Sequence, residues 1–270
     1  MIDNTPIYNA LTIAGSDSGG GAGIQADLKA FSASGVFGAS VITAVTAQNT
    51  QECRGIAALE PDFILQQLET VFDDIRIDAV KTGMLGDVAT VKVVAEFLAD
   101  KDVPLVVDPV MIAKSGDALL KAEAVSTLIN ELLPIATLIT PNLPEAAAIL
   151  GKPEPANYEQ MKSAAKELYS LGAKAVLLKG GHLEGEDCLD LLFDGKEFFT
   201  FRTERIPTTN THGTGCTLAS AITASLAKGE SLVDAVSIAK NYITEAIKHA
   251  DKLTVGSGHG PVNHFHSFWK

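Results

Sequence analysis

The chain has 270 residues, of which 46% are hydrophobic and 20% charged, a composition that supports a substantial core. Its formal net charge of -12 argues against a protein that binds nucleic acid and against docking on an anionic membrane. The three cysteines form no CxxC pair, and no apolar run approaches the ~20 residues that span a bilayer. We therefore expect a cytoplasmic protein, whose acidic surface is still compatible with a local cationic pocket for phosphate.

Short apolar segments alternate with longer helical patterns along the chain. The apolar segments predict strands at residues 10–14, 41–45, 79–81, 105–107, 137–139 and 175–178, and a hairpin formed by residues 188–193 and 197–201. Helical periodicity predicts helices at residues 22–34, 88–98, 122–133, 213–227 and 232–250, with a further helix that opens at Pro61. Repeated βα units without a linker-like shift in composition predict a single domain over residues 1–270, a three-layer α/β/α fold with a central, mostly parallel sheet.

Polar and glycine-rich segments follow the predicted strands. Residues 15–23 follow the first strand and contain seven glycine or serine residues, and later strands lead into polar side chains that include Gln48, Asp108, Asn142 and Lys179. Ligands of open α/β sheets bind beyond the carboxyl ends of the strands. The sequence therefore predicts a cleft at this edge of the sheet.

The most informative segment is Thr-His-Gly-Thr-Gly-Cys at residues 211–216, which opens a predicted helix. Its glycines allow the backbone to approach a ligand closely, and the free amides and dipole of a helix start favour negative charge. Preorganised donors of this kind stabilise the charge on a phosphoryl group in transfer. The alternative is a glycine-rich turn that binds no ligand; the surrounding motifs favour the phosphate site.

Cys216 lies in the first turn of that helix. A thiol at a helix start can have a lowered pKa and act as a base or nucleophile. The alternative, a small buried side chain that only packs the helix, is equally compatible with the sequence.

Asp108 and Glu145 are candidate ligands of Mg²⁺, bound directly or through water, because this ion prefers oxygen donors. Each is also explained as a helix-capping or first-turn acid. Lys179, at the end of a strand, is a candidate for neutralising phosphate, although an exposed lysine on the surface is the simpler explanation.

Two other patterns carry weaker signals. Residues 15–23 match a GxGxxG-like pattern, but no strand ends in an acidic residue at the distance a dinucleotide site requires, and the P-loop pattern GxxxxGK[ST] is absent. His259, His264 and His266 lack the partners of a zinc site, so we expect an ordered polar tail.

Seven motifs, taken in order, together resemble the bacterial hydroxymethylpyrimidine/phosphomethylpyrimidine kinases of thiamine biosynthesis, which have a ribokinase-like fold. They are AGSDSGGGAGIQADLKA (14–30), TAVTAQNT (43–50), VKTGML (80–85), VVDPVM (106–111), TPNLPEA (140–146), LLKGGH (177–182) and NTHGTGC (210–216). The closing GHGPVNHF (258–265) is similar to the end of these enzymes as well. The likeness extends from about residue 11 to the C-terminus.

The resemblance implies two successive ATP-dependent phosphorylations with Mg²⁺, first of 4-amino-5-hydroxymethyl-2-methylpyrimidine and then of its monophosphate, and it suggests a homodimer. Gln48 would bind the aminopyrimidine edge, since an amide donates and accepts side by side. The remaining residues implied are Asp27, Met84, Gly15 and Ala22 in the substrate pocket, Gly213, Thr214 and Gly215 in the anion hole, Asp108, Asn142 and Glu145 around Mg²⁺ and phosphate, and Lys179 and Thr211 beside the phosphates.

Cys216 departs from the wider superfamily, which usually has an aspartate there as the general base, and this cysteine is typical of the pyrimidine branch. We expect it to assist deprotonation of the alcohol, with positioning, Mg²⁺ and the anion hole supplying most of the rate.

Three alternatives stay open. A pyridoxal (vitamin B6) kinase would share the fold and the anion hole. A nicotinamide-dependent oxidoreductase would need a dinucleotide fingerprint that the chain lacks. A non-catalytic protein that binds a thiamine precursor is disfavoured by the glycine-rich loop at residues 213–215, Asp108 and Glu145.

Overall fold

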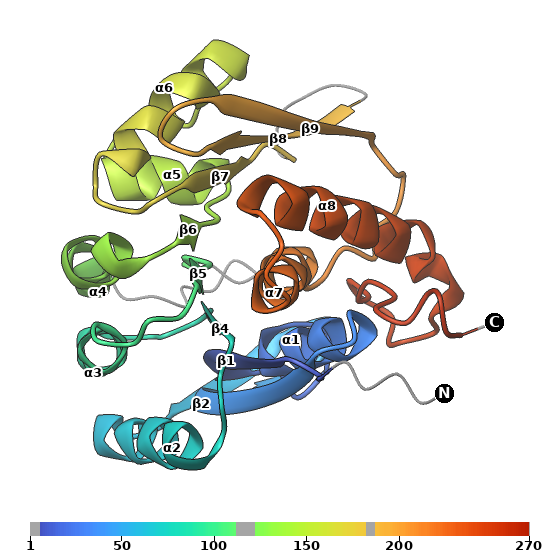
Figure 1. The fold of residues 1–270 in the computed structure, drawn as a ribbon. Helices are drawn as coiled ribbons and strands as arrows, with labels where there is room; N and C mark the ends of the chain where they lie inside the picture. Colours follow the sequence, from blue (N-terminus) through green and yellow to red (C-terminus); the bar gives the residue numbers. More distant parts are fainter. Residues whose placement is uncertain (1–5, 112–121, 182–186, 270) are drawn as a thin grey trace.

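The computed structural model describes residues 6–111, 122–181 and 187–269, and one nine-stranded sheet runs through them (Figure 1). The strand order is β3-β2-β1-β4-β5-β6-β7-β8-β9, and every pair from β2 to β7 is parallel, whereas β3, β8 and β9 add antiparallel edges. The strands are β1 (Asn9–Ser16), β2 (Phe37–Gln48), β3 (Cys53–Ala58), β4 (Ala79–Thr82), β5 (Leu105–Val107), β6 (Leu138–Ile139), β7 (Val176–Lys179), β8 (Asp187–Phe193) and β9 (Phe198–Glu204).

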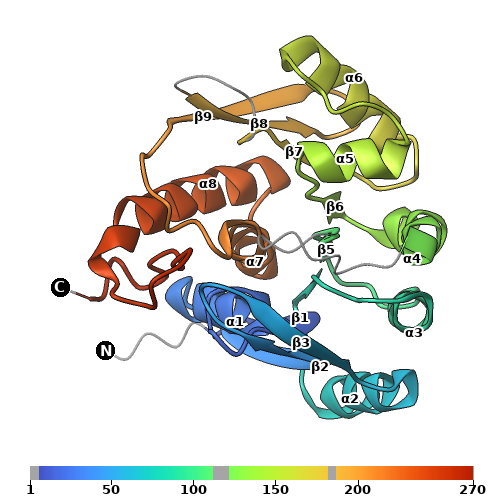
Figure 2. The same cartoon turned by 180° about the vertical axis from the view of Figure 1, so that it is seen from behind.

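Helices cover both faces of the sheet, which confirms the predicted three-layer α/β/α architecture (Figures 1 and 2). One face carries α1 (Gly23–Ala33), α7 (Thr214–Ala227) and α8 (Leu232–Lys248). The other carries α2 (Pro61–Asp74), α3 (Val88–Leu98), α4 (Ala122–Thr127), α5 (Leu143–Leu150) and α6 (Tyr158–Tyr169). Within the described ranges, no helix combines the length and the apolar character needed to cross a membrane.

Local sequence explains where several of these helices begin. Pro61 occupies the first turn of α2, where its missing N–H costs no hydrogen bond, and Ile64 and Leu68 follow one turn apart as fully buried residues. Ser231 caps α8 by accepting a hydrogen bond from the Asp234 amide. The central strands are apolar on both sides because helices cover both faces, and the segment 10–14 of β1 is buried throughout.

Several elements differ from the prediction, and α5 and α6 are not among the predicted helices. The strand β3 was not predicted, because it is mostly exposed at the sheet edge and its sequence has no apolar alternation, and β2, its antiparallel partner, is longer than expected. The helix predicted at residues 122–133 ends as α4 at Thr127 and continues as a π-helical turn over Leu128–Leu132. Pro134, which has no N–H to donate, lies in the 3-10 turn Leu133–Ile135 that follows.

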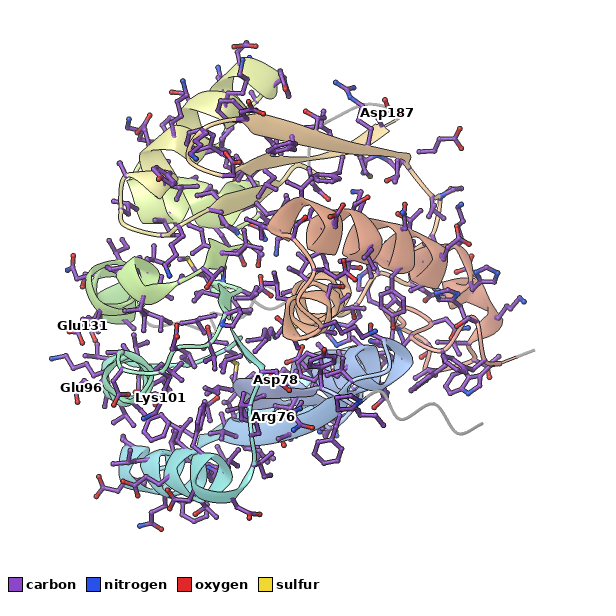
Figure 3. The ribbon with its side chains drawn as sticks, in the orientation of Figure 1. Arg76, Asp78, Glu96, Lys101, Glu131 and Asp187 are labelled. Atoms are coloured by element: carbon purple, nitrogen blue, oxygen red, sulfur yellow. The ribbon has the colours of Figure 1, made fainter. Side chains whose placement is uncertain are left out.

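Many charged side chains lie on the outside of the molecule, as Figure 3 shows for Glu96, Glu131 and Asp187 at its rim. Arg76 and Asp78 form an exposed ion pair of 3.0 Å between Nε and Oδ1. The excess negative charge is therefore largely a property of the surface. Most of the charged side chains inside the molecule form ion pairs, which are Asp27 with Lys81, Asp108 with Lys179 and Asp190 with Lys240.

Candidate active site

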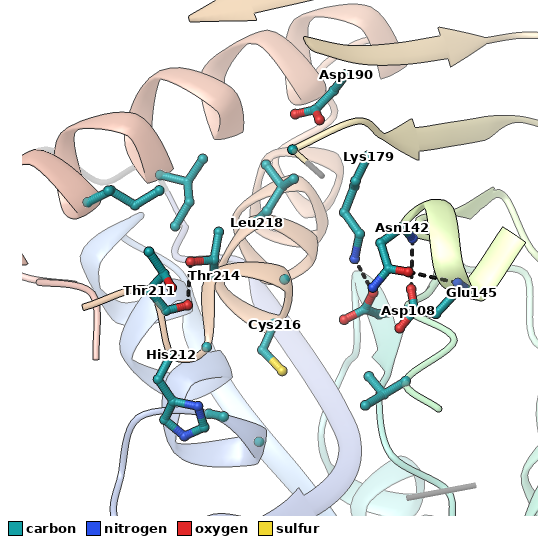
Figure 4. Close-up of a pocket in the computed structure, with 18 of the residues that line it drawn as sticks. Asp108, Asn142, Glu145, Lys179, Asp190, Thr211, His212, Thr214, Cys216 and Leu218 are labelled. Atoms are coloured by element: carbon teal, nitrogen blue, oxygen red, sulfur yellow. Dashed lines mark hydrogen bonds and ion pairs between the residues drawn. The ribbon is translucent and has the colours of Figure 1, made fainter. Parts of the chain in front are cut away.

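A cavity of about 1230 Å³ opens where β1, β2, β4, β5 and β7 end and α7 begins (Figure 4). The sequence predicted a cleft at this edge of the sheet, and the structure confirms it. The structure brings together thirteen of the predicted site residues on its wall, namely Gly15, Ala22, Gln48, Met84, Asp108, Asn142, Glu145, Lys179, Thr211, Gly213, Thr214, Gly215 and Cys216.

The residues of the predicted anion hole, Gly213, Thr214 and Gly215, lie at the start of α7 on the cavity wall. Gly213 precedes the helix with φ of 76°, a left-handed conformation that disfavours other residues. A Cβ at this position would also collide with the carbonyl of Gly21, so the glycine-rich loop packs directly on the helix start. The Thr214 amide and hydroxyl donate to the carbonyl of Thr211, whereas the amides of Gly215 and Cys216 precede the first helical hydrogen bond.

Cys216 is half-buried in the first turn of α7. Burial raises the pKa of its thiol to about 11, although the nearby Lys81 ammonium acts in the opposite direction. The expectation of a lowered pKa is therefore wrong, because desolvation and the carboxylates of Asp27 and Asp108 outweigh the cation and the helix start. The thiol is neutral at physiological pH.

Lys179 and Asp108 form an ion pair beside the anion hole, with 2.9 Å between Nζ and Oδ1 (Figure 4). Thr140 donates to the same carboxylate oxygen at 3.0 Å. Burial opposes charge on both groups, but each holds the other ionised, so the pKa of Asp108 is lowered and that of Lys179 is raised. Lys179 is largely buried, which excludes the alternative of an exposed surface lysine.

Asn142 and Glu145 cap α5 and also line the cavity. The Asn142 side chain accepts a hydrogen bond from the Glu145 amide, and the Asn142 amide donates to Glu145 Oε2, both at 2.8 Å. The capping explanation is therefore confirmed, and the position of both residues on the cavity wall is compatible with the predicted site role. Burial raises the pKa of Glu145 to about 7, since the attraction of Lys179 only partly offsets it and Asp108 adds repulsion.

Asp27 does not lie on the cavity wall, which corrects the expected pocket role. It is completely buried behind Lys81, whose Nζ donates to both carboxylate oxygens at 2.9 and 2.8 Å. Ser220 and Thr12 donate to the same carboxylate at 2.7 and 2.6 Å. Asp27 therefore holds Lys81, which does line the cavity, and Ser220 of α7 in place.

The acceptor end of the cavity contains the predicted substrate residues Gln48, Met84, Gly15 and Ala22. Thr43 donates to the carbonyl of Met84 at 2.7 Å and so fixes the backbone after β4. A Cβ on Gly15 would overlap the end of the Met84 side chain, which explains the glycine at this position. The absence of a side chain at Gly15 leaves space for the end of the Met84 side chain, which lines the cavity.

Two further pairs on the cavity wall were not predicted. His212 Nε2 lies 2.9 Å from Asp17 Oδ2 at the acceptor end, and Lys240 Nζ lies 2.6 Å from Asp190 Oδ2 at the other end. The partners of the first pair are 195 positions apart and those of the second pair 50. The motifs contained Asp17 and His212, but only the folded topology shows that they meet.

The end of the cavity beyond Lys179 is more apolar. It is lined by side chains from the segment after β9 and from the two long helices, including Ile206, Leu218, Ile243 and Ile247. A planar aromatic ligand fits such a surface better than an anion does. The cavity therefore has a polar acceptor end, a charged centre and an apolar far end.

Comparison with known proteins places this site in a family. Residues 17–263 match the family model described as Phosphomethylpyrimidine kinase. The hydroxymethylpyrimidine/phosphomethylpyrimidine kinase of Rhizobium meliloti is 52% identical over 261 residues, which cover 97% of this chain and 98% of the relative.

Two solved structures are similar as well. The phosphomethylpyrimidine kinase of Clostridium difficile is 49% identical with a TM-score of 0.79, and the match covers 89% of this chain and 100% of that one. The pyridoxal kinase of Staphylococcus aureus in complex with AMP-PCP and pyridoxal is 37% identical with a TM-score of 0.90, covering 98% and 96%. The expected ribokinase-like fold is confirmed by these neighbours, and the chain belongs to the phosphomethylpyrimidine kinase family.

Proposed function

We propose that this protein transfers the γ-phosphate of ATP to 4-amino-5-hydroxymethyl-2-methylpyrimidine and then to the resulting monophosphate, as a step of thiamine biosynthesis. The observation that carries the proposal is one continuous cavity that joins the Gln48 end to the glycine-rich start of α7. The identity of 52% to the Rhizobium meliloti kinase supports the pyrimidine over pyridoxal as the acceptor. The apolar far end suits the adenine of ATP.

Each half of the cavity has a task in this reaction. The Gln48 amide binds the aminopyrimidine edge and Met84 packs against the ring, which positions the hydroxymethyl group near Cys216. The amides of Gly215 and Cys216 and the ammonium of Lys179 stabilise the charge on the phosphoryl group in transfer. Thr211 and Thr214 hold the turn that presents those amides.

Mg²⁺ fits the carboxylates beside the anion hole. Asp108 and Glu145 lie close enough for each charge to affect the other, and Mg²⁺ is usually held by one or two carboxylates together with substrate phosphates. When bound, the ion would neutralise charge on the nucleotide phosphates. Asp108 and Glu145 would hold it, directly or through water, with Asn142 keeping the Glu145 carboxylate in position.

Cys216 enters the proposal as a neutral side chain beside the acceptor hydroxyl, because its pKa of about 11 makes it a poor proton acceptor at neutral pH. We expect a Cys216→Ala variant to keep more than one tenth of the parent kcat, measured by ADP release at pH 7.5. A loss of on the order of 1000-fold with unchanged folding would instead make the thiol an obligatory base.

The function is tested by ADP release with the hydroxymethylpyrimidine, its monophosphate, pyridoxal or no acceptor, each with and without Mg²⁺. We expect Mg²⁺-dependent turnover of both pyrimidines, with products one phosphate heavier by mass spectrometry. Turnover of pyridoxal alone would replace the proposal with a vitamin B6 kinase. Binding of the pyrimidine without ADP release would indicate a non-catalytic binding protein.

The domain organisation, the cellular location and the oligomeric state belong to the same proposal. We propose that residues 1–270 form one domain, since a single sheet runs through the described residues. We also propose a cytoplasmic homodimer, on the resemblance to the kinase family. Analytical ultracentrifugation that found a monomer at micromolar concentration would exclude the dimer.

A further inference from the structure

His212 occupies a junction between three segments of the acceptor end that are far apart in sequence. Its side chain contacts Asp17 in the glycine-rich loop, with 2.9 Å between Nε2 and Oδ2. The same Nε2 lies 3.4 Å from the amide nitrogen of Gln48, at the end of β2. His212 also immediately precedes Gly213, so this residue links the glycine-rich loop and Gln48 to the start of α7.

Asp17 determines which nitrogen of this ring carries hydrogen. Its Oδ1 accepts the Gly19 amide at 2.8 Å, and its Oδ2 accepts the amides of Gly21 and Ala22 at 3.1 and 2.9 Å. Burial opposes ionisation, but these donors and His212 lower the pKa of Asp17, so the group is a carboxylate. A carboxylate only accepts hydrogen bonds, and therefore Nε2 of His212 must donate to it.

This tautomer has a consequence for Gln48. An Nε2 that bears hydrogen has no lone pair in the ring plane, so it cannot accept a hydrogen bond from the Gln48 amide 3.4 Å away. The 3.4 Å contact is therefore not a hydrogen bond, and the two amide hydrogens of Gln48 stay available for a ligand in the cavity. An accepting nitrogen at the same place would bind one of them.

The backbone of His212 is held from the other side by the closing segment of the chain. Its amide donates to the carbonyl of Gly260 at 3.0 Å, and its carbonyl accepts the Val262 amide at 3.4 Å. The same segment reaches the turn after Gln48, because the His259 amide donates to the carbonyl of Thr50 at 2.8 Å. The imidazole is thus fixed by backbone contacts as well as by Asp17.

We propose that His212 is a positioning residue for the acceptor, which donates its Nε2 hydrogen to Asp17 and thereby keeps the Gln48 amide hydrogens available to the heterocycle. The inference rests on the proposed function for the identity of the acceptor, but not for the tautomer. The proposal gives Asp17, His212 and the closing segment 258–262 a role in recognition of the substrate heterocycle.

The tautomer is measured directly by ¹⁵N NMR of the full chain with labelled histidine, the His212 signals being assigned by their absence in His212→Gln. We expect hydrogen on Nε2 of His212 in the free enzyme at pH 8. A ring with hydrogen on Nδ1 alone would overturn the proposal. This readout needs no turnover, so it decides the tautomer even if the pyrimidine is not the substrate.

Kinetics test the consequence for the acceptor. We expect His212→Leu to raise KM for the hydroxymethylpyrimidine by about tenfold, the effect of roughly one hydrogen bond, while KM for ATP changes less than twofold. His212→Gln, whose amide nitrogen can donate to Asp17, should restore at least half of that loss on a logarithmic scale. Gln66→Leu is the matched control, because the Gln66 side chain is exposed on α2, outside the cavity, and this variant should behave as the parent.

Two results would overturn the proposal. One is an acceptor KM within twofold of the parent in His212→Leu with folding confirmed by circular dichroism. The other is an equal rise of both KM values without rescue by glutamine, which indicates general damage to the fold. Failure of the parent itself to phosphorylate the pyrimidine would refute the proposed function and leave the NMR result to decide the role of Asp17.

Discussion

The two ends of the cavity are lined by different kinds of side chain, polar at one end and mainly apolar at the other. At the acceptor end, Asp17, His212 and Gln48 form a chain of polar contacts, and the glycine-rich loop packs against the start of α7. At the far end, Ile206, Leu218 and Ile247 offer mainly apolar surface, with the Lys240–Asp190 pair as a buried polar contact. The charged centre with Lys179 and Asp108 lies between them.

The difference indicates how selective each end is. A site that hydrogen-bonds its ligand rejects an analogue without the matching group strongly, since its own polar groups are then left unpaired, whereas an apolar pocket discriminates by only about 10- to 200-fold. We therefore expect strict recognition of the heterocycle and looser recognition of the nucleotide base. Three substitutions and a pH profile test this contrast, beginning with the start of α7, which lies between the two ends.

The largest effect is expected from Gly213→Ala. The left-handed φ of 76° and the contact with the Gly21 carbonyl leave no room for a Cβ, so the amides of the anion hole must move. Loss of aligned donors should lower kcat by on the order of 100-fold or more, measured by ADP release. Gly229→Ala is the control, because Gly229 has a similar φ of 83° after α7, outside the cavity, and open space around it. Gly213→Ala with more than a third of the parent kcat would contradict this role.

Gln48→Leu should separate the two ends. We expect KM for the pyrimidine to rise at least about tenfold because the amide contacts are lost, with KM for ATP unchanged. Gln66→Leu, on the exposed side of α2, is the matched control. An equal rise in both KM values would mean that binding of the pyrimidine is not independent of binding of ATP.

The pH profile tests the centre. Glu145 has a pKa raised to about 7, so it is mostly protonated at pH 6 and ionised at pH 8. If its carboxylate holds Mg²⁺, kcat at limiting Mg²⁺ should fall about tenfold between pH 8 and pH 6, one unit below the pKa. Higher Mg²⁺ should move this acidic limb to lower pH, because the ion binds the ionised form. A limb that persists unchanged in Glu145→Gln would assign it to another group.

The smallest effect is expected at the apolar end. Ile247→Ala removes part of the surface proposed to contact the nucleotide base, and a two- to fivefold rise in KM for ATP is expected from an effect of about 1 kcal/mol or less, with the acceptor KM unchanged. Ile238→Ala, on the exposed side of α8, is the control. A loss as large as that of Gln48→Leu would show that both ends are equally selective.

Much of the architecture could be predicted because local patterns specify it. The buried parallel strands are apolar on both faces, and Pro61 marks the start of α2 as expected. The strand β3 carries no such pattern, since five of its six residues are exposed and only pairing with β2 makes it a strand. The π-helical turn after α4 is likewise an outcome of packing rather than of periodicity.

The site was predictable to the extent that strand ends meet at one edge of a parallel sheet. That rule brings Gln48, Asp108, Asn142 and Lys179 to one cavity without any knowledge of side-chain positions. The rule cannot say which side of a helix faces the ligand. Asp27 was assigned to the pocket from the family resemblance, and its carboxylate turns to Lys81 instead. The rule also cannot give the electrostatic balance that raises the pKa of Cys216.

The hydrogen bonds between the closing segment and the backbone of His212 have a consequence for folding during synthesis. Gly260 and Val262 bind the backbone of His212, and the amide of residue 259 binds Thr50, so the pocket around His212 is completed by residues that are synthesised after every strand of the sheet. A nascent chain whose sheet has already formed inside the cell would still lack a competent pyrimidine site. Catalysis would begin only once residues 258–262 have left the ribosome and docked.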